Sequence, residues 1–257
     1  MKSSRSFFAL LISAAMLLAN STFAQIAAPS APVTPTASPS GTPRVPRTPE
    51  SAITPVEKDP KRHRQLLDRV KQGGIDLLFV GDSITDFWNR VGEKSWLKFA
   101  PLNPGNLGIS ADRTEHVLWR FEHGELEGIS PKLAVVMIGT NNLGQGPDEQ
   151  PEWDAAGIKK ILDTLRAKLP ETKILLLAIF PRGDAHDPIR ERIAKVNEII
   201  ATYADGKTIH FLDVGKVFLD EQGNIPPGIM PDKLHPSAFG YDRWYDAIRP
   251  TVDEMMK

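Results

Sequence analysis

Short apolar runs alternate with longer stretches in which apolar residues recur at helical spacing. The apolar runs are Ile75–Val80, Leu133–Ile138, Lys173–Ile179 and Ile209–Asp213, with a weaker one near Leu102–Leu107. Runs of this length that are apolar throughout suit strands covered on both faces. The helical stretches between them are Arg113–Glu122, Asp154–Lys168 and Pro188–Ala204. Strands that alternate with amphipathic helices predict βαβ units and a mainly parallel sheet in three layers.

Capping residues, prolines and glycines indicate where the first and last helices of the predicted domain begin and end. Asp59-Pro60 is a capping residue followed by a proline at the first helical position, and Gly73-Gly74 ends that helix. A last helix is expected to start near Ser237, and Pro250 is expected to end or kink it. The pattern predicts one folded domain over residues 59–257.

The charge balance and the lack of cysteine exclude several classes of function. The chain has 31 basic and 32 acidic residues, which gives no electrostatic reason to bind nucleic acid or an anionic membrane. It has no cysteine, which excludes disulfides, thiolate zinc sites and a cysteine nucleophile. Gly183–Asp187 has the composition of a metal-binding loop, but no further ligand cluster accompanies it, so a polar surface loop is favoured. We therefore expect no metal and no other cofactor.

The first 24 residues resemble a secretory signal peptide. Lys2 and Arg5 precede an apolar stretch from Phe7 to Leu18, and small Ala24 follows a short polar segment. The stretch is shorter than the ~20 residues that cross a bilayer, although an uncleaved anchor or a buried helix stays an alternative. Cleavage after Ala24 predicts a secreted or periplasmic protein, and no other segment of the mature chain reaches membrane length.

Residues 25–58 have the composition of a tether. Nine of the 22 prolines lie between Gln25 and Pro60, among Ala, Ser and Thr. Such a segment buries too little apolar surface to offset its ordering entropy, which favours a mobile linker. A proline-rich ligand for a partner domain is the alternative interpretation.

Polar residues follow three of the predicted strands. Ser83 lies in Gly81-Asp82-Ser83, Gly108 follows the weaker strand, and Asn141-Asn142 follows the next. Ligand sites of parallel sheets lie beyond the carboxyl ends of the strands, so these residues are expected to meet there. Each also has a plain structural explanation, since serine often caps helices and asparagine often satisfies turns.

Asp232 and His235 complete a constellation for acyl transfer. A histidine that takes a proton from a serine needs an acceptor on its other ring nitrogen, and Asp232 lies three residues before His235. Ser83 is then the nucleophile, His235 the general base and acid, and Asp232 the group that orients the imidazole. The amides of Ser83 and Gly108 and the side chain of Asn141 are the expected oxyanion hole.

Several stretches of the sequence resemble one family along most of the predicted domain. They read LLFVGDSI, NLGISADRTEHVLWRF, GELEGISPK, VVMIGTNN, FPRG, DPIRERIAKVNEII and DKLHPSAFGY. With Ser83, Gly108, Asn141 and Asp232-x-x-His235 in this order, the chain resembles the SGNH, or GDSL, esterases and lipases. Within them it is most similar to the catalytic subunits of platelet-activating factor acetylhydrolase type IB.

The resemblance implies a three-layer α/β/α flavodoxin-like fold with five parallel strands in the order 2-1-3-4-5. It also implies an open site, the Ser-His-Asp roles given above, a preference for short acyl groups and a homodimer as one assembly state. Asn142 departs from the general family pattern, which has aspartate there, but the acetylhydrolase branch has asparagine too. The secretory signal is absent from those intracellular subunits.

These observations predict a secreted serine esterase that acts on acetyl or other short acyl esters, with a carbohydrate ester as substrate. A phospholipid acetylhydrolase or lysophospholipase-like enzyme, and a non-catalytic binding module, are the alternatives. Ile84, Thr140 and the 214–231 loop are the expected walls of the acyl pocket. A sugar-binding surface or the core is the expected place of three tryptophans, Trp88, Trp96 and Trp119. A substrate contact or a salt bridge is the expected role of two arginines, Arg113 and Arg182.

Overall fold

A five-stranded parallel sheet forms the centre of the structure, a computed structural model that describes residues 46–146 and 148–257. The strands are β1 (Leu77–Gly81), β2 (Pro104–Gly108), β3 (Leu133–Met137), β4 (Lys173–Leu177) and β5 (Ile209–Leu212). Their order is β2-β1-β3-β4-β5, and each neighbouring pair is parallel. The predicted fold class and strand order are confirmed. The expected signal peptide, residues 1–24, lies outside the described residues.

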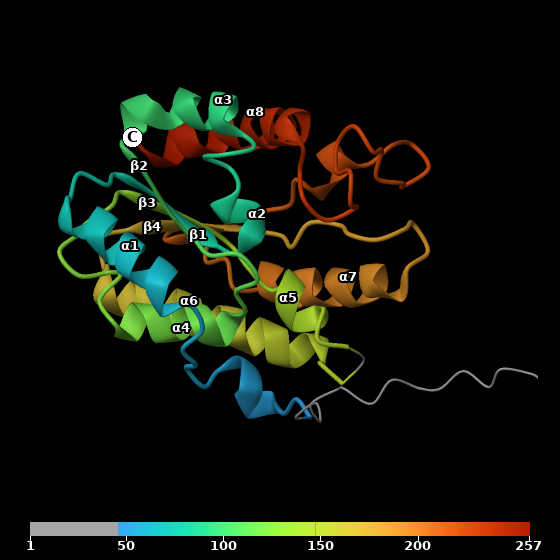
Figure 1. The fold of residues 1–257 in the computed structure, drawn as a ribbon, viewed down its shortest axis with the longest axis horizontal. Helices are drawn as coiled ribbons and strands as arrows, with labels where there is room; N and C mark the ends of the chain where they lie inside the picture. Colours follow the sequence, from blue (N-terminus) through green and yellow to red (C-terminus); the bar gives the residue numbers. More distant parts are fainter. Residues whose placement is uncertain (1–45, 147) are drawn as a thin grey trace, which may run out of the picture. The chain divides into compact units, whose positions relative to one another are not determined.

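Helices cover both faces of the sheet (Figure 1). One face carries α1 (Pro60–Lys71), α4 (Thr114–Glu122), α6 (Pro151–Lys168) and α7 (Pro188–Ala201), and the other carries α3 (Glu93–Trp96) and α8 (Ala238–Met255). Side chains alternate along each strand, so that Leu78 and Val80 pack under the first set and Leu77 and Phe79 under the second. Burial on both faces explains why the inner strands β1 and β3 are apolar throughout, whereas the edge strands β2 and β5 contain Asn106 and His210.

Short turns of helix connect the main elements. They are η1 (Pro49–Ala52), α2 (Ser83–Asp86), η2 (Leu97–Leu102), α5 (Thr140–Leu143) and η3 (Gly215–Phe218). Two of them, α2 and α5, directly follow strands β1 and β3 and therefore lie at the carboxyl edge of the sheet. This edge is where the sequence places the candidate site.

The predicted helix starts are confirmed at Asp59 and Ser237, and of the two effects expected of Pro250 the end of the helix is not observed. Asp59 caps α1 by accepting the N–H of Arg62 at 2.9 Å. Ser237 caps α8 by accepting the N–H of Gly240 at 3.1 Å. Pro250 does not end α8, which continues to Met255.

Residues 46–58, which we call the N-terminal strap, pack against the domain. Ala52 is fully buried, and its carbonyl oxygen accepts the hydroxyl of Thr114 at 2.8 Å. Arg47 forms ion pairs of 2.7 Å with both Glu115 and Glu149. The expected tether over residues 25–58 is therefore wrong for its described part. Composition gave the wrong boundary because a few specific contacts, rather than apolar content, hold the strap; the rest of the expected tether, through residue 45, lies outside the described residues.

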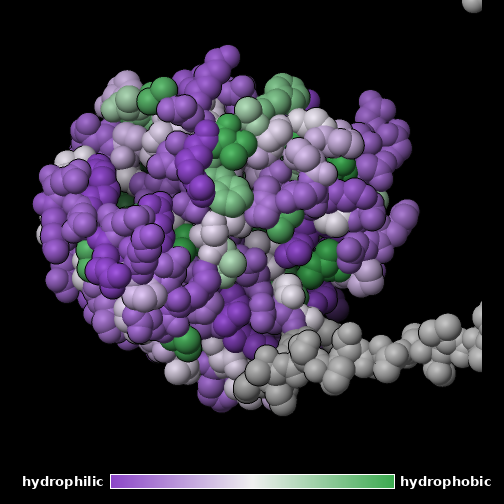
Figure 2. Space-filling view, viewed as in Figure 1, coloured by the Kyte–Doolittle hydropathy of each residue, from purple (hydrophilic) through white to green (hydrophobic). Residues whose placement is uncertain are grey.

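The surface seen in Figure 2 is mainly hydrophilic, with apolar side chains scattered over it. Among the described residues, the exposed large apolar side chains are those of Val56, Val91, Leu97 and Phe239. Within the described ranges, 46–146 and 148–257, no helix combines the length and apolar character that a membrane crossing requires.

Candidate active site

Ser83 is the first residue of α2, immediately beyond the carboxyl end of β1. The turn is tight: a Cβ at Gly81 would collide with the side chain of Thr85 and the carbonyl oxygen of Met137. Asp82 caps the short helix, since its Oδ1 accepts the N–H of Ile84 at 3.0 Å. The glycine and the cap together place the Ser83 side chain at the edge of the sheet.

Ser83, His235 and Asp232 form a continuous chain of hydrogen bonds. Ser83 Oγ lies 2.9 Å from His235 Nε2, and His235 Nδ1 lies 2.6 Å from Asp232 Oδ2. Ser83 and His235 are 152 residues apart in sequence, so only the fold brings them together. The structure thus places the three predicted residues in the order that proton transfer from a serine requires.

Hydrogen bonds from backbone amides to the Asp232 side chain stabilise the Asp232–His235 turn. Asp232 Oδ1 accepts the N–H of Leu234 at 3.0 Å and that of His235 at 2.7 Å. Lys233, between them, adopts a left-handed conformation with φ 59°. Partial burial alone would raise the pKa of Asp232, but hydrogen bonds from the His235 ring and from these two amides keep it below its usual value. Asp232 is therefore held in the charged form that can orient the imidazole.

Aromatic packing fixes α2 against α8. The Tyr241 hydroxyl donates to the carbonyl of Ile84 at 2.7 Å, and the rings of Trp88 and Trp244 stack at 3.9 Å. The ring of Phe87 lies 5.1 Å from that of His235. Trp88 is fully buried, so it belongs to the core and offers no surface to a sugar.

Of the three expected oxyanion donors, the structure leaves two available. The Ser83 amide is the first of α2, where no preceding helical carbonyl can accept it. Asn141 Nδ2 donates to the carbonyl of Asp112 at 2.9 Å, which uses one of its two hydrogens. The Gly108 amide, in contrast, already donates to Asn106 Oδ1 at 2.8 Å.

Gly108 is needed for packing instead. A Cβ at this position would collide with the backbone nitrogen and Cα of Asp86 in α2. Glycine therefore lets β2 approach the helix that starts with Ser83, and the expectation that Gly108 supplies an oxyanion donor is not met.

Ala111 is a residue that the sequence did not single out. It is exposed, its φ is 60°, and among the described residues no acceptor is found for its amide N–H. It lies between Ser110, whose hydroxyl donates to Asp86 Oδ2 at 2.8 Å, and Asp112, whose carbonyl holds Asn141. A left-handed alanine has no sequence signature, which is why only the structure reveals this amide.

Asn142 supports the site from behind. It is fully buried, its Oδ1 accepts the N–H of Thr114 at 3.0 Å, and its Nδ2 donates to Thr114 Oγ1 at 2.9 Å and to Glu115 Oε2 at 3.2 Å. These contacts join the turn after β3 to the start of α4. Asn142 is therefore a structural residue that holds Asn141 in place.

Two buried carboxyl groups near the site are unusual acids. Burial is the main cause that raises the pKa of Asp82 to about 7, partly offset by the hydrogen bond from the Ile84 amide. Burial likewise raises the pKa of Asp154 well above its usual value, and neither oxygen of Asp154 has a hydrogen-bond partner among the described residues. Both groups favour the protonated form more than an exposed aspartate does.

Ile84 and Thr140 do not line an open acyl pocket. Each side chain belongs to a residue that is 1% exposed: Ile84 packs in the core, and the Thr140 hydroxyl accepts from Arg182 at 3.3 Å. Arg182 also donates to the Thr140 carbonyl at 3.1 Å, and Arg113 pairs with Glu115 at 2.5 Å. The four residues thus have structural contacts, and the expectation for Ile84 and Thr140 is wrong because the chain turns both side chains inward.

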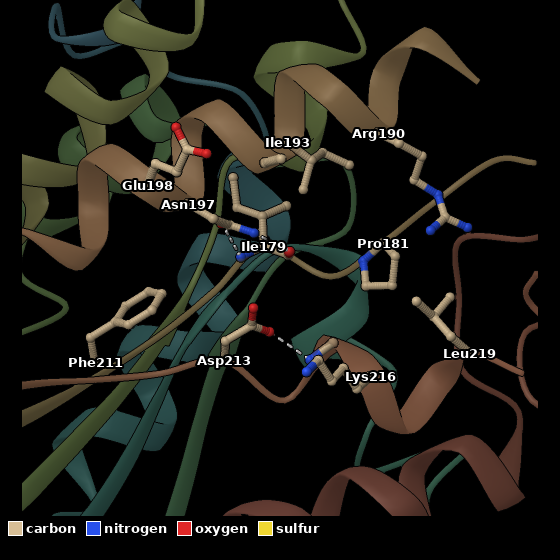
Figure 3. Close-up of a pocket in the computed structure, with 12 residues that line it drawn as sticks. Ile179, Pro181, Arg190, Ile193, Asn197, Glu198, Phe211, Asp213, Lys216 and Leu219 are labelled. Carbon is tan, nitrogen blue, oxygen red and sulfur yellow. Dashed lines mark hydrogen bonds between the residues drawn. The ribbon is translucent and has the colours of Figure 1, made fainter. Parts of the chain in front are cut away.

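A cavity of about 450 Å³ lies between α7 and the segment that follows β5 (Figure 3). Its walls include Ile179, Ile193 and Phe211, and Asp213 and Lys216 add charges. None of the triad residues lines it, so this hollow is distinct from the candidate active site.

The segment Gly183–Asp187 is used for structure. Asp184 pairs with Lys233, and Asp187 caps α7 by accepting the N–H of Ile189 at 2.9 Å. Among the residues that the structure describes, no group of three or more His, Cys, Asp or Glu side chains is arranged to bind a metal ion.

Comparison with known proteins shows the family of the chain. The model of the GDSL-like lipase/acylhydrolase family matches residues 79–243, and the chain belongs to this family. It is 36% identical over 181 residues to platelet-activating factor acetylhydrolase IB subunit alpha1 of Bos taurus, covering 70% of this chain and 75% of the relative. It is also 36% identical over 198 residues to subunit alpha2 of Gallus gallus, covering 76% and 84%.

Solved structures show the same fold. A GDSL-like lipase from Bacteroides thetaiotaomicron superposes with a TM-score of 0.60 at 22% identity, covering 76% of this chain and 97% of the other. An acetylxylan esterase from Geobacillus stearothermophilus superposes with a TM-score of 0.56 at 20% identity, covering 69% and 94%.

Proposed function

We propose that this acylhydrolase is a secreted serine esterase that removes acetyl or other short acyl groups, with O-acetylated carbohydrates as its substrates. The observation that carries the proposal is the hydrogen-bond chain from Ser83 Oγ through the His235 ring to Asp232. A pure binding module has no use for this arrangement, because each member serves a proton transfer.

The reaction proceeds in two halves. Ser83 Oγ attacks the acyl carbonyl carbon while His235 Nε2 takes the hydroxyl proton, and Asp232 stabilises the imidazolium that forms. The bond from carbon to the alcohol oxygen then breaks, and His235 returns the proton to the leaving alcohol. Water repeats the sequence on the acyl-serine and releases the carboxylic acid.

The oxyanion hole consists of the amides of Ser83 and Ala111 and the free hydrogen of Asn141 Nδ2. Ala111 replaces Gly108 in this role, because the Gly108 amide is already bonded to Asn106. The hydrogen bond from Asn141 to the carbonyl of Asp112, the residue after Ala111, supports the pairing of these two donors. Removing one such donor typically lowers kcat by about 10²–10³.

The acyl group and the alcohol of the proposed substrate are assigned from different observations. The relatives at 36% identity are named acetylhydrolases, which supports a short acyl group. The predicted signal peptide supports a substrate outside the cytoplasm, which favours carbohydrate esters. The same relatives are named for a phospholipid, platelet-activating factor, so an acetyl-phospholipid is the second candidate.

Purified protein lacking residues 1–24 tests the proposal. We expect hydrolysis of p-nitrophenyl acetate much faster than of the palmitate ester, and its loss in Ser83→Ala. Equal hydrolysis by Ser83→Ala would reject the nucleophile. Release of acetate from acetylated xylan, compared with release from an acetyl-phospholipid, separates the two substrate classes: faster release from the phospholipid contradicts the carbohydrate assignment.

A further inference from the structure

We propose that Lys58, in the N-terminal strap, is a positioning residue of the oxyanion hole that orients and polarises the Ala111 amide. The inference rests on the proposed function, because it presupposes an oxyanion that this amide stabilises. It adds a residue that lies outside the α/β core and outside the part matched by the family model, residues 79–243.

Lys58 contacts the loop between β2 and α4 at two points. Its Nζ donates to the carbonyl oxygen of Ser110 and lies 3.2 Å from Asp112 Oδ1. The Lys58 side chain is 28% exposed and that of Asp112 only 1%. The ammonium group is therefore directed inward, at the peptide between Ser110 and Ala111.

The geometry of a trans peptide connects this contact to the Ala111 amide. The carbonyl of Ser110 and the N–H of Ala111 belong to the same planar unit and point in opposite directions. Because Lys58 holds the carbonyl, the N–H points away from the strap. A cation on the oxygen also withdraws electron density from the peptide, which makes the N–H a better donor to a negative charge.

The rest of the loop is attached to the two elements that carry the other donors. Ser110 Oγ donates to Asp86 in α2, the helix that begins with Ser83. The Asp112 carbonyl accepts from Asn141 in α5. The three proposed donors are therefore joined through residues 110–112, and Lys58 binds the middle peptide of this segment.

Asp112 keeps a second cationic partner when Lys58 is replaced. It keeps an ion pair of 2.9 Å with Arg120. Because Arg120 remains beside the buried Asp112 carboxylate, loss of the partly exposed Lys58 is expected to lower the free energy of unfolding less than loss of a sole partner would. The main effect of removing the ammonium group is thus expected in catalysis.

The test compares Lys58→Met, which keeps the side-chain length without the charge, with Lys58→Arg, which keeps a cationic donor. We expect Lys58→Met to lower kcat for p-nitrophenyl acetate about tenfold with KM unchanged within twofold, because the polarised donor acts on the transition state. Inhibition by a small alkylboronic acid, which forms a tetrahedral anion on serine, should weaken by a similar factor. Lys58→Arg should restore most of the loss.

Lys61→Met is the matched control. Lys61 is exposed in α1, and among the described residues it has neither an ion pair nor a side-chain hydrogen bond. The kcat of Lys61→Met should therefore equal that of the unmodified protein. Far-ultraviolet circular dichroism and thermal unfolding check that all variants are folded.

A kcat of Lys58→Met within twofold of the unmodified protein would overturn the inference. So would a rise in KM with kcat unchanged, because that result would make Lys58 a contact of the ground state. The failure of the proposed function is separate: it appears as hydrolysis by Ser83→Ala, whatever Lys58→Met does.

Discussion

Gly183 donates its backbone N–H to the carbonyl oxygen of Lys233 at 2.9 Å, which joins the β4–α7 loop to the turn that carries Asp232 and His235. Arg190 in turn holds the loop, with its Nε 2.6 Å from the carbonyl of Arg182 and its Nη2 3.1 Å from that of Gly183. The position of the histidine therefore depends on a loop that contributes no member of the triad.

This relationship makes Gly183→Ala a sensitive substitution. Gly183 has φ +69°, and an added Cβ would collide with the carboxylate of Asp187. We expect a loss of about 1–2 kcal/mol in the free energy of unfolding from the left-handed backbone alone, together with a lower kcat because the Lys233 carbonyl loses its fixed partner. Gly206→Ala is the control: the φ of Gly206 is +67°, but no atom of the described residues lies within 4 Å of the added Cβ, so urea unfolding should show the backbone cost without a change in kcat.

Asp232→Asn should lower kcat by about 10²–10⁴ with little change in stability. The amide oxygen can still accept the N–H groups of Leu234 and His235, but the charge that stabilises the imidazolium is lost. Asp220 forms a similar turn, accepting the N–H groups of Gln222 and Asn224. Steady-state kinetics should therefore show no effect of Asp220→Asn, and an equal effect of the two variants would contradict the role given to Asp232.

Asp82 should make the protein less stable as the pH rises. Its pKa is raised to about 7 in the folded state against about 3.8 unfolded, so the folded state holds its proton more tightly. The stabilisation is complete below pH 3.8 and is lost as pH rises to 7, at about 1.4 kcal/mol per pH unit as an upper limit.

Asp82→Asn should remove that part of the pH dependence. Urea unfolding at pH 5 and pH 8 should show a smaller difference in the variant than in the unmodified protein. Asp154, whose pKa is raised by burial as well, is present in both proteins and cancels in the comparison. The same slope in both proteins would show that Asp82 does not titrate in this range.

Substitutions at Ala111 test the reassigned oxyanion donor. Ala111→Gly keeps the amide and relieves a left-handed conformation, so we expect kcat within about twofold and unchanged or slightly higher stability. Ala111→Val keeps the amide too, but a β-branched residue resists φ 60°, so the peptide should rotate and kcat should fall about tenfold or more. Equal kcat values for the two variants would exclude a catalytic role of this amide.

The sheet could be predicted from sequence because each strand is a local pattern. Burial on both faces forces a continuous apolar run, and the order of strands follows from the resemblance. Ser83, Asp232 and His235 could also be selected, since a serine after a buried strand and an Asp-x-x-His segment are local features, and the structure brings them into hydrogen-bond distance.

What could not be predicted depends on contacts between distant residues. Arg47 lies 68 residues from Glu115 and 102 from Glu149, so composition alone describes its segment as a tether. The proposal of Ala111 instead of Gly108 as an oxyanion donor also depends on contacts between residues distant in sequence. The amide of Gly108 donates to Asn106, whereas the left-handed Ala111 lies between Ser110 and Asp112, which Lys58 contacts from a distant part of the chain.

The strap also sets the shortest fragment worth producing. A recombinant protein trimmed to begin at residue 59 would lose Arg47 and leave the Glu149 carboxylate buried without its guanidinium partner. Breaking a buried pair in this way costs about 3–5 kcal/mol, a large part of the stability of a typical domain. Poor solubility or low yield of such a fragment would then result from the choice of its first residue and not from an unstable enzyme.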